Sequence, residues 1–248
     1  ALYLTQGFTY DSAEGADRRF SGEDPGFVYS RFNNPTVKMF EDRLALLEGA
    51  EVCRATATGM AAVHSALMGL VRAGDHVVAG NALFGSCRWL IAEWLPRFGV
   101  ETTFVDATDL SAWEAAIKPN TKAVLIETPS NPVLEITDIA AVSKLAHAVG
   151  AKVIVDNVFA TPIFQQPLAL GADVVVYSAT KHIDGQGRVL GGAILTTEAI
   201  NEEFYRDSMR HTGPSLSPFN AWVMLKGLET LDLRVRRQTD TAAALADV

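Results

Sequence analysis

Short, continuous runs of apolar residues alternate with amphipathic segments through the middle of the chain. The apolar runs have the length of strands and lie at residues 76–79, 101–105, 122–126, 152–155, 173–177 and 192–195. The segments between them carry apolar residues at helical spacing and predict helices at residues 86–98, 110–117 and 138–149. Because the strands are apolar throughout and alternate with helices, they predict an α/β fold with a mostly parallel sheet between layers of helices.

The segments on either side of this alternation have different patterns. Residues 1–35 are polar, glycine-rich and aromatic with little periodicity, so we expect an extended arm there rather than a core element. Helical spacing begins at residue 36 and recurs at 60–71, and after residue 197 the chain carries helical patterns only. We therefore divide the chain into an arm, a large domain and a helical segment, at residues 1–35, 36–215 and 216–248.

The composition disfavours several classes of partner. The chain has 248 residues, 48% of them hydrophobic, and a formal net charge of −8, which argues against nucleic acid or an anionic membrane as the main partner. It contains no apolar run near the roughly 20 residues that a membrane span needs and no signal-peptide pattern. Cys53 and Cys87 form no CxxC pattern, so we predict neither a disulfide framework nor a metal site.

The cysteine pattern favours a reducing, cytoplasmic setting, and the net charge does not exclude a small anionic ligand, which responds to the local charges of its site. Because the sequence starts with Ala1 and stops within a helical pattern, we expect further residues at both ends of the natural protein. The basic cluster LRVRR at 233–237 is typical of a solvated helix face, and GQGRVLGG at 185–192 does not have the spacing of a dinucleotide-binding loop.

Candidate chemistry follows the predicted strands. In open α/β sheets, ligands bind beyond the carboxyl ends of the strands, and three of these strands end near Asn131, Asp156 and Lys181. A lysine at the end of a buried strand is partly desolvated, which favours the neutral, nucleophilic amine. Ser178 and Thr180 lie close enough in sequence to Lys181 to bind a phosphate beside it. A nucleophilic lysine beside a phosphate site indicates pyridoxal phosphate.

The other polar positions fit the same cofactor. A carboxylate such as Asp156 can keep the pyridine nitrogen protonated, and the amide of Asn131 can bond the phenolic oxygen of the ring. The predicted helix start at Thr58, Gly59 and Met60 offers backbone N–H groups and a positive dipole end for the phosphate. Each residue also has an ordinary interpretation, as a solvated turn, a strand-end cap or a helix N-cap. The combination, in this order along the chain, favours the cofactor site.

Several motifs together resemble one enzyme family. They are YSRFNNPT at 29–36, ATGMAAV at 57–63, ETPSNP at 127–132, VDNVFATP at 155–162, SATKHIDGQG at 178–187 and LSPFNAWVMLKGLETL at 216–231. They resemble the transsulfuration enzymes of cysteine and methionine metabolism, which are pyridoxal-phosphate proteins of the aspartate-aminotransferase-like (type I) fold. The resemblance implies a large cofactor-binding domain followed by a smaller C-terminal domain that this sequence does not include.

The resemblance also implies a role for each candidate residue. It makes Lys181 the Schiff-base lysine and proton shuttle, and Asp156 the partner of the pyridine nitrogen. The implied contacts to the phosphate and the ring come from Gly59, Met60, Asn131, Ser178 and Thr180.

Three aromatic and basic positions carry further implications. Tyr29 and Arg31 match family residues that reach the phosphate of a neighbouring subunit, and the arginine fork suits that role. They imply a homodimer or homotetramer with shared active sites. Phe84 stands where most relatives have a tyrosine that stacks on the cofactor ring, and it keeps the aromatic face without the hydroxyl. The replacement of tyrosine by Phe84 is either a packing variant without functional effect or a feature that distinguishes a subgroup of the family.

The motifs around Phe84, Asp156 and Lys181 look most like the sulfhydrylase subgroup that acts on O-succinylhomoserine. The implied reaction is a γ-replacement in methionine biosynthesis, in which an O-acylhomoserine and sulfide give homocysteine. Cystathionine γ-synthase and methionine γ-lyase activities remain alternatives within the family. A non-catalytic, cofactor-binding module is the alternative from another class.

Overall fold

The computed structural model describes residues 1–247 and contains one seven-stranded mixed sheet. The strands are β1 (Val52–Thr56), β2 (His76–Gly80), β3 (Glu101–Val105), β4 (Thr121–Glu127), β5 (Lys152–Asp156), β6 (Val174–Tyr177) and β7 (Gly192–Thr196). Their order across the sheet is β1-β7-β6-β5-β4-β2-β3. Strands β2 to β6 pair in parallel, whereas β7 runs antiparallel between β6 and β1.

The six strands predicted from apolar runs are all present, and the mostly parallel α/β sheet is confirmed. Strand β1 was not predicted. Its sequence, VCRAT, has only three apolar residues among five positions, and the strand lies at the edge of the sheet. Such a short, half-buried edge strand carries a weaker signal than a strand buried on both faces.

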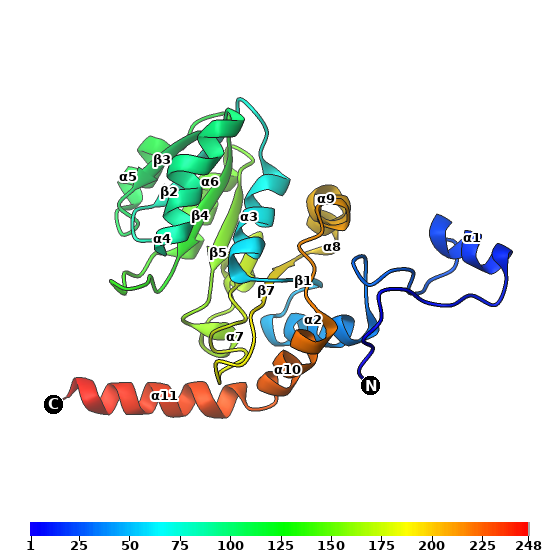
Figure 1. Cartoon of the computed structure of the whole chain (residues 1–248). Helices are drawn as coiled ribbons and strands as arrows, with labels where there is room; N and C mark the ends of the chain where they lie inside the picture. Colours follow the sequence, from blue (N-terminus) through cyan, green and yellow to red (C-terminus); the bar gives the residue numbers. More distant parts are fainter. Residues whose placement is uncertain (248) are drawn as a thin grey trace.

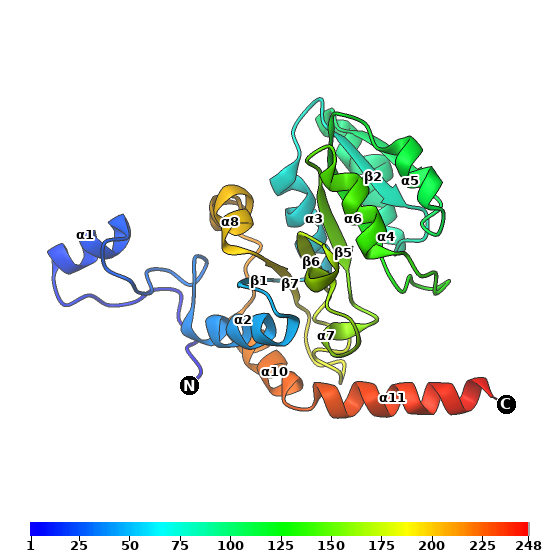
Figure 2. The ribbon, with the colours of Figure 1, turned by 180° about the vertical axis from the view of Figure 1, so that it is seen from behind.

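Helices cover both faces of the sheet, as Figures 1 and 2 show from opposite sides. Successive strand residues point to opposite faces, so Val174 and Val176 pack in one core while Val175 and Tyr177 pack in another. The first core contains residues of α3 (Gly59–Leu70) and of the segment formed by α4 (Gly85–Trp89), η1 (Leu90–Trp94) and η2 (Leu95–Phe98). That segment is the predicted helix at 86–98, which the structure divides into α-helical, π-helical and 3₁₀ turns.

On the opposite face, one core contains α5 (Leu110–Ala116) and α6 (Ile139–His147), and another contains α2 (Pro35–Glu48) and α10 (Pro218–Leu228). The remaining helices are α7 (Thr161–Phe164), η3 (Pro167–Leu170), α8 (Glu198–Ile200), η4 (Asn201–Tyr205), α9 (Arg206–Thr212) and α11 (Leu231–Ala246). The chain after residue 197 is helical, as predicted, although Val248 of the predicted helical segment lies outside the described residues.

The N-terminal arm extends away from the sheet (Figures 1 and 2). It carries one helix that the sequence pattern did not predict, α1 (Ala13–Ser21), which buries none of its residues. Ser12 caps its start and Gly22, with φ of 83°, ends it, so local capping rather than core packing defines this helix. Within the described residues, we find no helix with the length and apolar character of a membrane span.

Candidate active site

A cavity of about 610 Å³ opens at the carboxyl ends of β4, β5 and β6, beside the N-terminus of α3. It contains eight of the ten residues predicted for the site; Tyr29 and Arg31 lie elsewhere. The lining residues are Thr58, Gly59, Met60, Val63, Phe84, Ser86, Cys87, Glu127, Asn131, Asp156, Val158, Phe159, Ser178, Thr180, Lys181, His182 and Leu190. Six parts of the sequence thus converge at the carboxyl ends of the strands, where ligands bind in α/β folds.

The N-terminus of α3 lies directly against Ser178. Thr58 caps the helix by accepting a hydrogen bond from the Ala61 N–H at 3.0 Å. A Cβ atom built on Gly59 would lie 2.5 Å from the Ser178 Cβ, so only glycine permits this contact. The first N–H groups of a helix have no partner within the helix. Together with the Ser178 hydroxyl, they form a cradle that fits a phosphate group.

Asp156 supplies a carboxyl group to the same cavity. Its Oδ1 atom accepts a hydrogen bond from the Val158 N–H at 3.1 Å. Burial raises the pKa of Asp156 to about 7, and the negative charge of Glu127 contributes in the same direction. A cationic partner would favour the ionised form of such a carboxyl group. The site therefore suits a protonated ring nitrogen.

Glu127 is a cavity residue that the sequence analysis missed. It is 7% exposed, and its two carboxylate oxygens accept hydrogen bonds from the backbone N–H groups of Phe84 at 2.6 Å and Asn131 at 2.8 Å. Burial raises its pKa, although both bonds lower it. Its sequence signal was the same as that of Asp156, a carboxylate that ends a buried strand.

Lys181 lies four residues beyond the end of β6, on a turn. The expectation of a desolvated lysine at a buried strand end is wrong for this chain, because Lys181 is exposed although it lines the cavity. The neighbouring Thr180 hydroxyl donates to the Gly191 carbonyl at 3.2 Å and accepts from the Gly191 N–H at 3.1 Å. Since the Thr180 proton is engaged, Ser178 offers the hydroxyl that is available to a phosphate.

Tyr29 and Arg31 are exposed and lie outside the cavity of their own chain. The Arg31 guanidinium lies 5.5 Å from the centroid of the Tyr29 ring and 4.7 Å from that of Phe32. It also donates a hydrogen bond to the backbone carbonyl of Arg210 in α9. A role for these two residues in the site of a neighbouring subunit stays a prediction.

The arrangement combines an anion cradle, a carboxylate, an amine and the aromatic face of Phe84 around one cavity. These groups match the phosphate, ring nitrogen, aldehyde and ring face of pyridoxal phosphate. The observation that tests the fit is the contact between Gly59 and Ser178, which brings helix N–H groups and a hydroxyl together.

Comparisons with known proteins agree with this chemistry. The model of the family described as "Cys/Met metabolism PLP-dependent enzyme" matches residues 1–248. The O-succinylhomoserine sulfhydrylase of Mycobacterium tuberculosis (strain ATCC 25618 / H37Rv) is 58% identical over 247 residues, which are 100% of this chain and 61% of that protein. The chain thus spans about three fifths of this relative.

Other relatives have either the same or a related activity. The O-succinylhomoserine sulfhydrylase of Pseudomonas aeruginosa is 51% identical over 100% of this chain and 61% of its own length. The L-methionine gamma-lyase of Treponema denticola is 44% identical over 99% of this chain and 62% of its own length. Identity is therefore higher to these two sulfhydrylases than to this lyase.

Solved structures have the same fold. MetB from Corynebacterium glutamicum superposes with a TM-score of 0.93 at 39% identity, covering 99% of this chain and 62% of that one. A Campylobacter jejuni protein named as an O-acetylhomoserine (thiol)-lyase (metY) superposes with a TM-score of 0.93 at 33% identity, covering 100% and 70%. The latter structure contains N'-pyridoxyl-lysine-5'-monophosphate at its position 205.

Proposed function

Because the chain belongs to the family of pyridoxal-phosphate-dependent enzymes of cysteine and methionine metabolism, we propose that it carries the cofactor site of an O-succinylhomoserine sulfhydrylase. In this reaction sulfide replaces the succinyloxy group at the γ-carbon, which gives homocysteine and releases succinate. The observation that carries the proposal is the 58% identity to the Mycobacterium tuberculosis sulfhydrylase over the whole of this chain. The cavity lined by Asp156 and Lys181 supports it.

Each group of the cofactor would be bound by different residues of the cavity. The Lys181 amine would bind its aldehyde carbon, and Asp156 would pair with its pyridine nitrogen. Ser178 and the first N–H groups of α3 would bind its phosphate, while the Asn131 side chain would bond the ring oxygen. When bound, pyridoxal phosphate supplies an electron sink that makes the hydrogen on the substrate α-carbon acidic.

The proton transfers then fall to Lys181. Once the substrate amine has displaced it, the neutral Lys181 amine would remove the α-proton and return a proton later in the reaction. Asp156 would remain ionised beside the protonated ring nitrogen, because that cation offsets the burial and the Glu127 charge that raise its pKa. Phe84 would cover the ring with its aromatic face and has no hydroxyl with which to move a proton.

Two residues outside the cavity would complete the site of a neighbouring subunit. Tyr29 and Arg31 are exposed, in the segment between α1 and α2. We therefore propose a homodimer or homotetramer with shared active sites. The free thiols Cys53 and Cys87 are consistent with a reducing compartment, so we propose that the enzyme acts in the cytoplasm.

The test is product analysis on the purified, cofactor-loaded protein. We expect homocysteine and succinate from O-succinylhomoserine with sulfide, and no product from the Lys181→Ala variant. A larger yield of cystathionine with cysteine as the nucleophile would favour the γ-synthase. The 44% identity to a methionine gamma-lyase makes L-methionine the second substrate to test, and faster cleavage of L-methionine would contradict the sulfhydrylase proposal. A loaded protein without any turnover would favour the non-catalytic alternative.

A further inference from the structure

Lys181 lies on a turn whose internal backbone hydrogen bonds join only nearby residues. Residues 179–184 form turns between the end of β6 and the return of the chain toward β7. The Lys181 N–H donates to the Ser178 carbonyl at 3.1 Å, and the Gly185 N–H donates to the Lys181 carbonyl at 2.7 Å. The Asp184 N–H also donates to the Ala179 carbonyl at 2.9 Å. Because these bonds join only nearby residues, the position of the lysine depends on what holds the turn against the rest of the fold.

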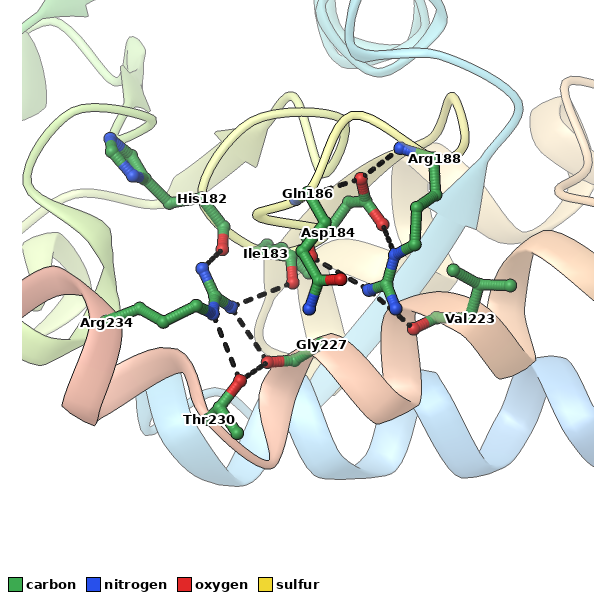
Figure 3. A network of polar contacts seen from close by, with 9 residues as sticks. All are labelled: His182, Ile183, Asp184, Gln186, Arg188, Val223, Gly227, Thr230 and Arg234. Atoms are coloured by element: carbon green, nitrogen blue, oxygen red, sulfur yellow. Dashed lines mark hydrogen bonds and ion pairs between the residues drawn. The ribbon is translucent and has the colours of Figure 1, made fainter.

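Asp184, at the end of the turn, forms a buried ion pair with Arg188. Its carboxylate is fully buried and accepts hydrogen bonds from the N–H of Arg188 at 2.7 Å and from its Nε at 2.9 Å. The Arg188 guanidinium also donates to the Asp184 carbonyl at 2.9 Å and reaches the Val223 carbonyl in α10 at 3.5 Å (Figure 3). Burial raises the pKa of Asp184, but these bonds outweigh it, so the pKa lies below its usual value. The ionised Asp184–Arg188 pair thus fixes the last residue of the turn.

Arg234, in α11, contacts the same turn through a backbone carbonyl. Its guanidinium donates to the His182 carbonyl at 2.8 Å and to the Gly227 carbonyl at 2.9 Å (Figure 3). The Gly227 carbonyl lies in the last turn of α10 and also accepts a hydrogen bond from the Thr230 N–H at 3.3 Å. The Nε atom of Arg234 donates to the Thr230 hydroxyl at 3.0 Å, which fixes the guanidinium at the corner between α10 and α11.

Two glycines leave no space between the turn and this corner. A Cβ atom on Gly185 would lie 1.9 Å from an Nη atom of Arg234, and one on Gly227 would lie 2.1 Å from the Ile183 carbonyl oxygen. The turn and the helices are therefore in direct contact. A movement of the α10–α11 corner would be transmitted to the backbone next to Lys181.

We propose that Arg234, together with the Asp184–Arg188 pair, is a positioning residue for Lys181. It bonds the carbonyl of His182, which adjoins the lysine and lines the cavity, and it ties that carbonyl to the α10–α11 corner. These hydrogen bonds keep the Lys181 amine in place while protons are transferred. The inference rests on the proposed function, in which Lys181 binds the cofactor.

The experiment compares Arg234→Gln and Arg234→Lys with the control Arg237→Gln, an exposed residue on the same helix. We expect Arg234→Gln to speed amide hydrogen exchange at least tenfold in the turn and the residues just after it, at 179–187. Misplacement of a catalytic group by about 1 Å can cost up to a hundredfold in rate, so kcat should fall roughly tenfold to a hundredfold with KM nearly unchanged. Arg234→Lys keeps the charge without the fork and should recover part of kcat. The control should behave as wild type.

Two results would overturn the proposal. In one, the amide hydrogens of the turn in Arg234→Gln exchange at the wild-type rate. In the other, Arg234→Gln has a lower thermal stability but an unchanged kcat. If Arg234→Gln does not fold, Arg234→Lys and Asp184→Asn provide the same comparison. Borohydride reduction followed by peptide mass analysis reports separately whether Lys181 binds the cofactor. A wild-type chain unlabelled at Lys181 would refute the proposed function and with it this role for Arg234, whereas labelling with unchanged exchange would refute the role of Arg234 alone.

Discussion

Glu127 and Asp156 occupy paired positions at the ends of the adjacent parallel strands β4 and β5, and both side chains line the cavity. The negative charge of Glu127 disfavours the ionised form of Asp156, which adds to the effect of burial on the Asp156 pKa. The Glu127 carboxylate is held in position by the hydrogen bonds that it accepts from the backbone N–H groups of Phe84 and Asn131. The pair therefore forms an electronegative site that a cationic ring nitrogen would neutralise.

Asp156→Asn should separate stability from cofactor binding. The pKa of Asp156 is raised from 3.8 to about 7, so its stabilising, protonated form is fully present below pH 4 and is lost as the pH rises through 7. The cofactor-free variant should therefore have a higher Tm than wild type at pH 8. Loss of the carboxylate should lower kcat/KM of the loaded enzyme by at least roughly a hundredfold. Thermal unfolding and steady-state kinetics check both effects, and an active variant would exclude Asp156 as the partner of the ring nitrogen.

Gly59→Ala should push α3 away from Ser178, because the added methyl group would lie 2.5 Å from the Ser178 Cβ. Overpacking of this kind costs about 1–3 kcal/mol of stability. We also expect the affinity for pyridoxal phosphate to fall about tenfold or more as the phosphate cradle widens. Gly15→Ala, on the exposed helix α1, is the matched control. Equal affinities in the two variants, measured by absorbance titration, would show that the contact does not shape the phosphate site.

The sequence predicted the parts of the site that follow strands. Asp156 ends the strand β5 and Lys181 lies four residues after β6, and parallel strands bring such residues to one end of the sheet by topology alone. The partners of Glu127 could not be predicted, because they are backbone groups, one of them 43 residues earlier in the chain. Arg234 was assigned to a solvated helix face, which is wrong. The structure shows it bonding carbonyls 52 residues earlier, and only the packed structure contains that information.

Phe84→Tyr tests whether proton transfer depends on Lys181 alone. Phe84 is 44% exposed at the cavity, so there is room for a hydroxyl group. We expect the stability to change by less than about 0.5 kcal/mol, as for other surface substitutions. With Lys181 moving the protons, kcat for homocysteine formation should change less than about threefold. A large increase in kcat, or a switch to cleavage of L-methionine, would instead make Phe84 a specificity residue.

Arg31→Ala and Lys181→Ala together test shared active sites. Arg31 lies outside its own chain's cavity, so its loss should weaken cofactor binding only through a neighbouring subunit. If sites are shared, mixing the two variants produces hybrid dimers with one complete site. Random assembly of two-fold dimers should restore about a quarter of the wild-type activity. Subunits that exchange without any recovery would contradict sharing, and wild-type cofactor affinity in Arg31→Ala alone would contradict a phosphate contact.

Glu48→Gln should raise the stability of the protein above neutral pH. Glu48 is 1% exposed, one of its carboxylate oxygens has no hydrogen-bond partner, and the other accepts a bond from the Tyr177 hydroxyl. Burial raises its pKa from 4.5 to about 7, although the Tyr177 bond lowers it. Since the folded state holds this proton more tightly than the unfolded chain does, the stabilisation is complete below pH 4.5 and is lost as the pH rises through 7.

Glutamine reproduces the protonated form of Glu48 at every pH. The free energy of unfolding of Glu48→Gln should therefore match wild type near pH 4.5 and exceed it at pH 8 by on the order of 1–3 kcal/mol. Urea unfolding at several pH values measures the difference, with the exposed Glu203→Gln as the control. Asp156 contributes the same trend to both proteins, so it cancels in the comparison. Curves that stay parallel from pH 4.5 to 8 would mean that the pKa of Glu48 is the same in the folded and unfolded states, and that its bond from Tyr177 compensates for its burial.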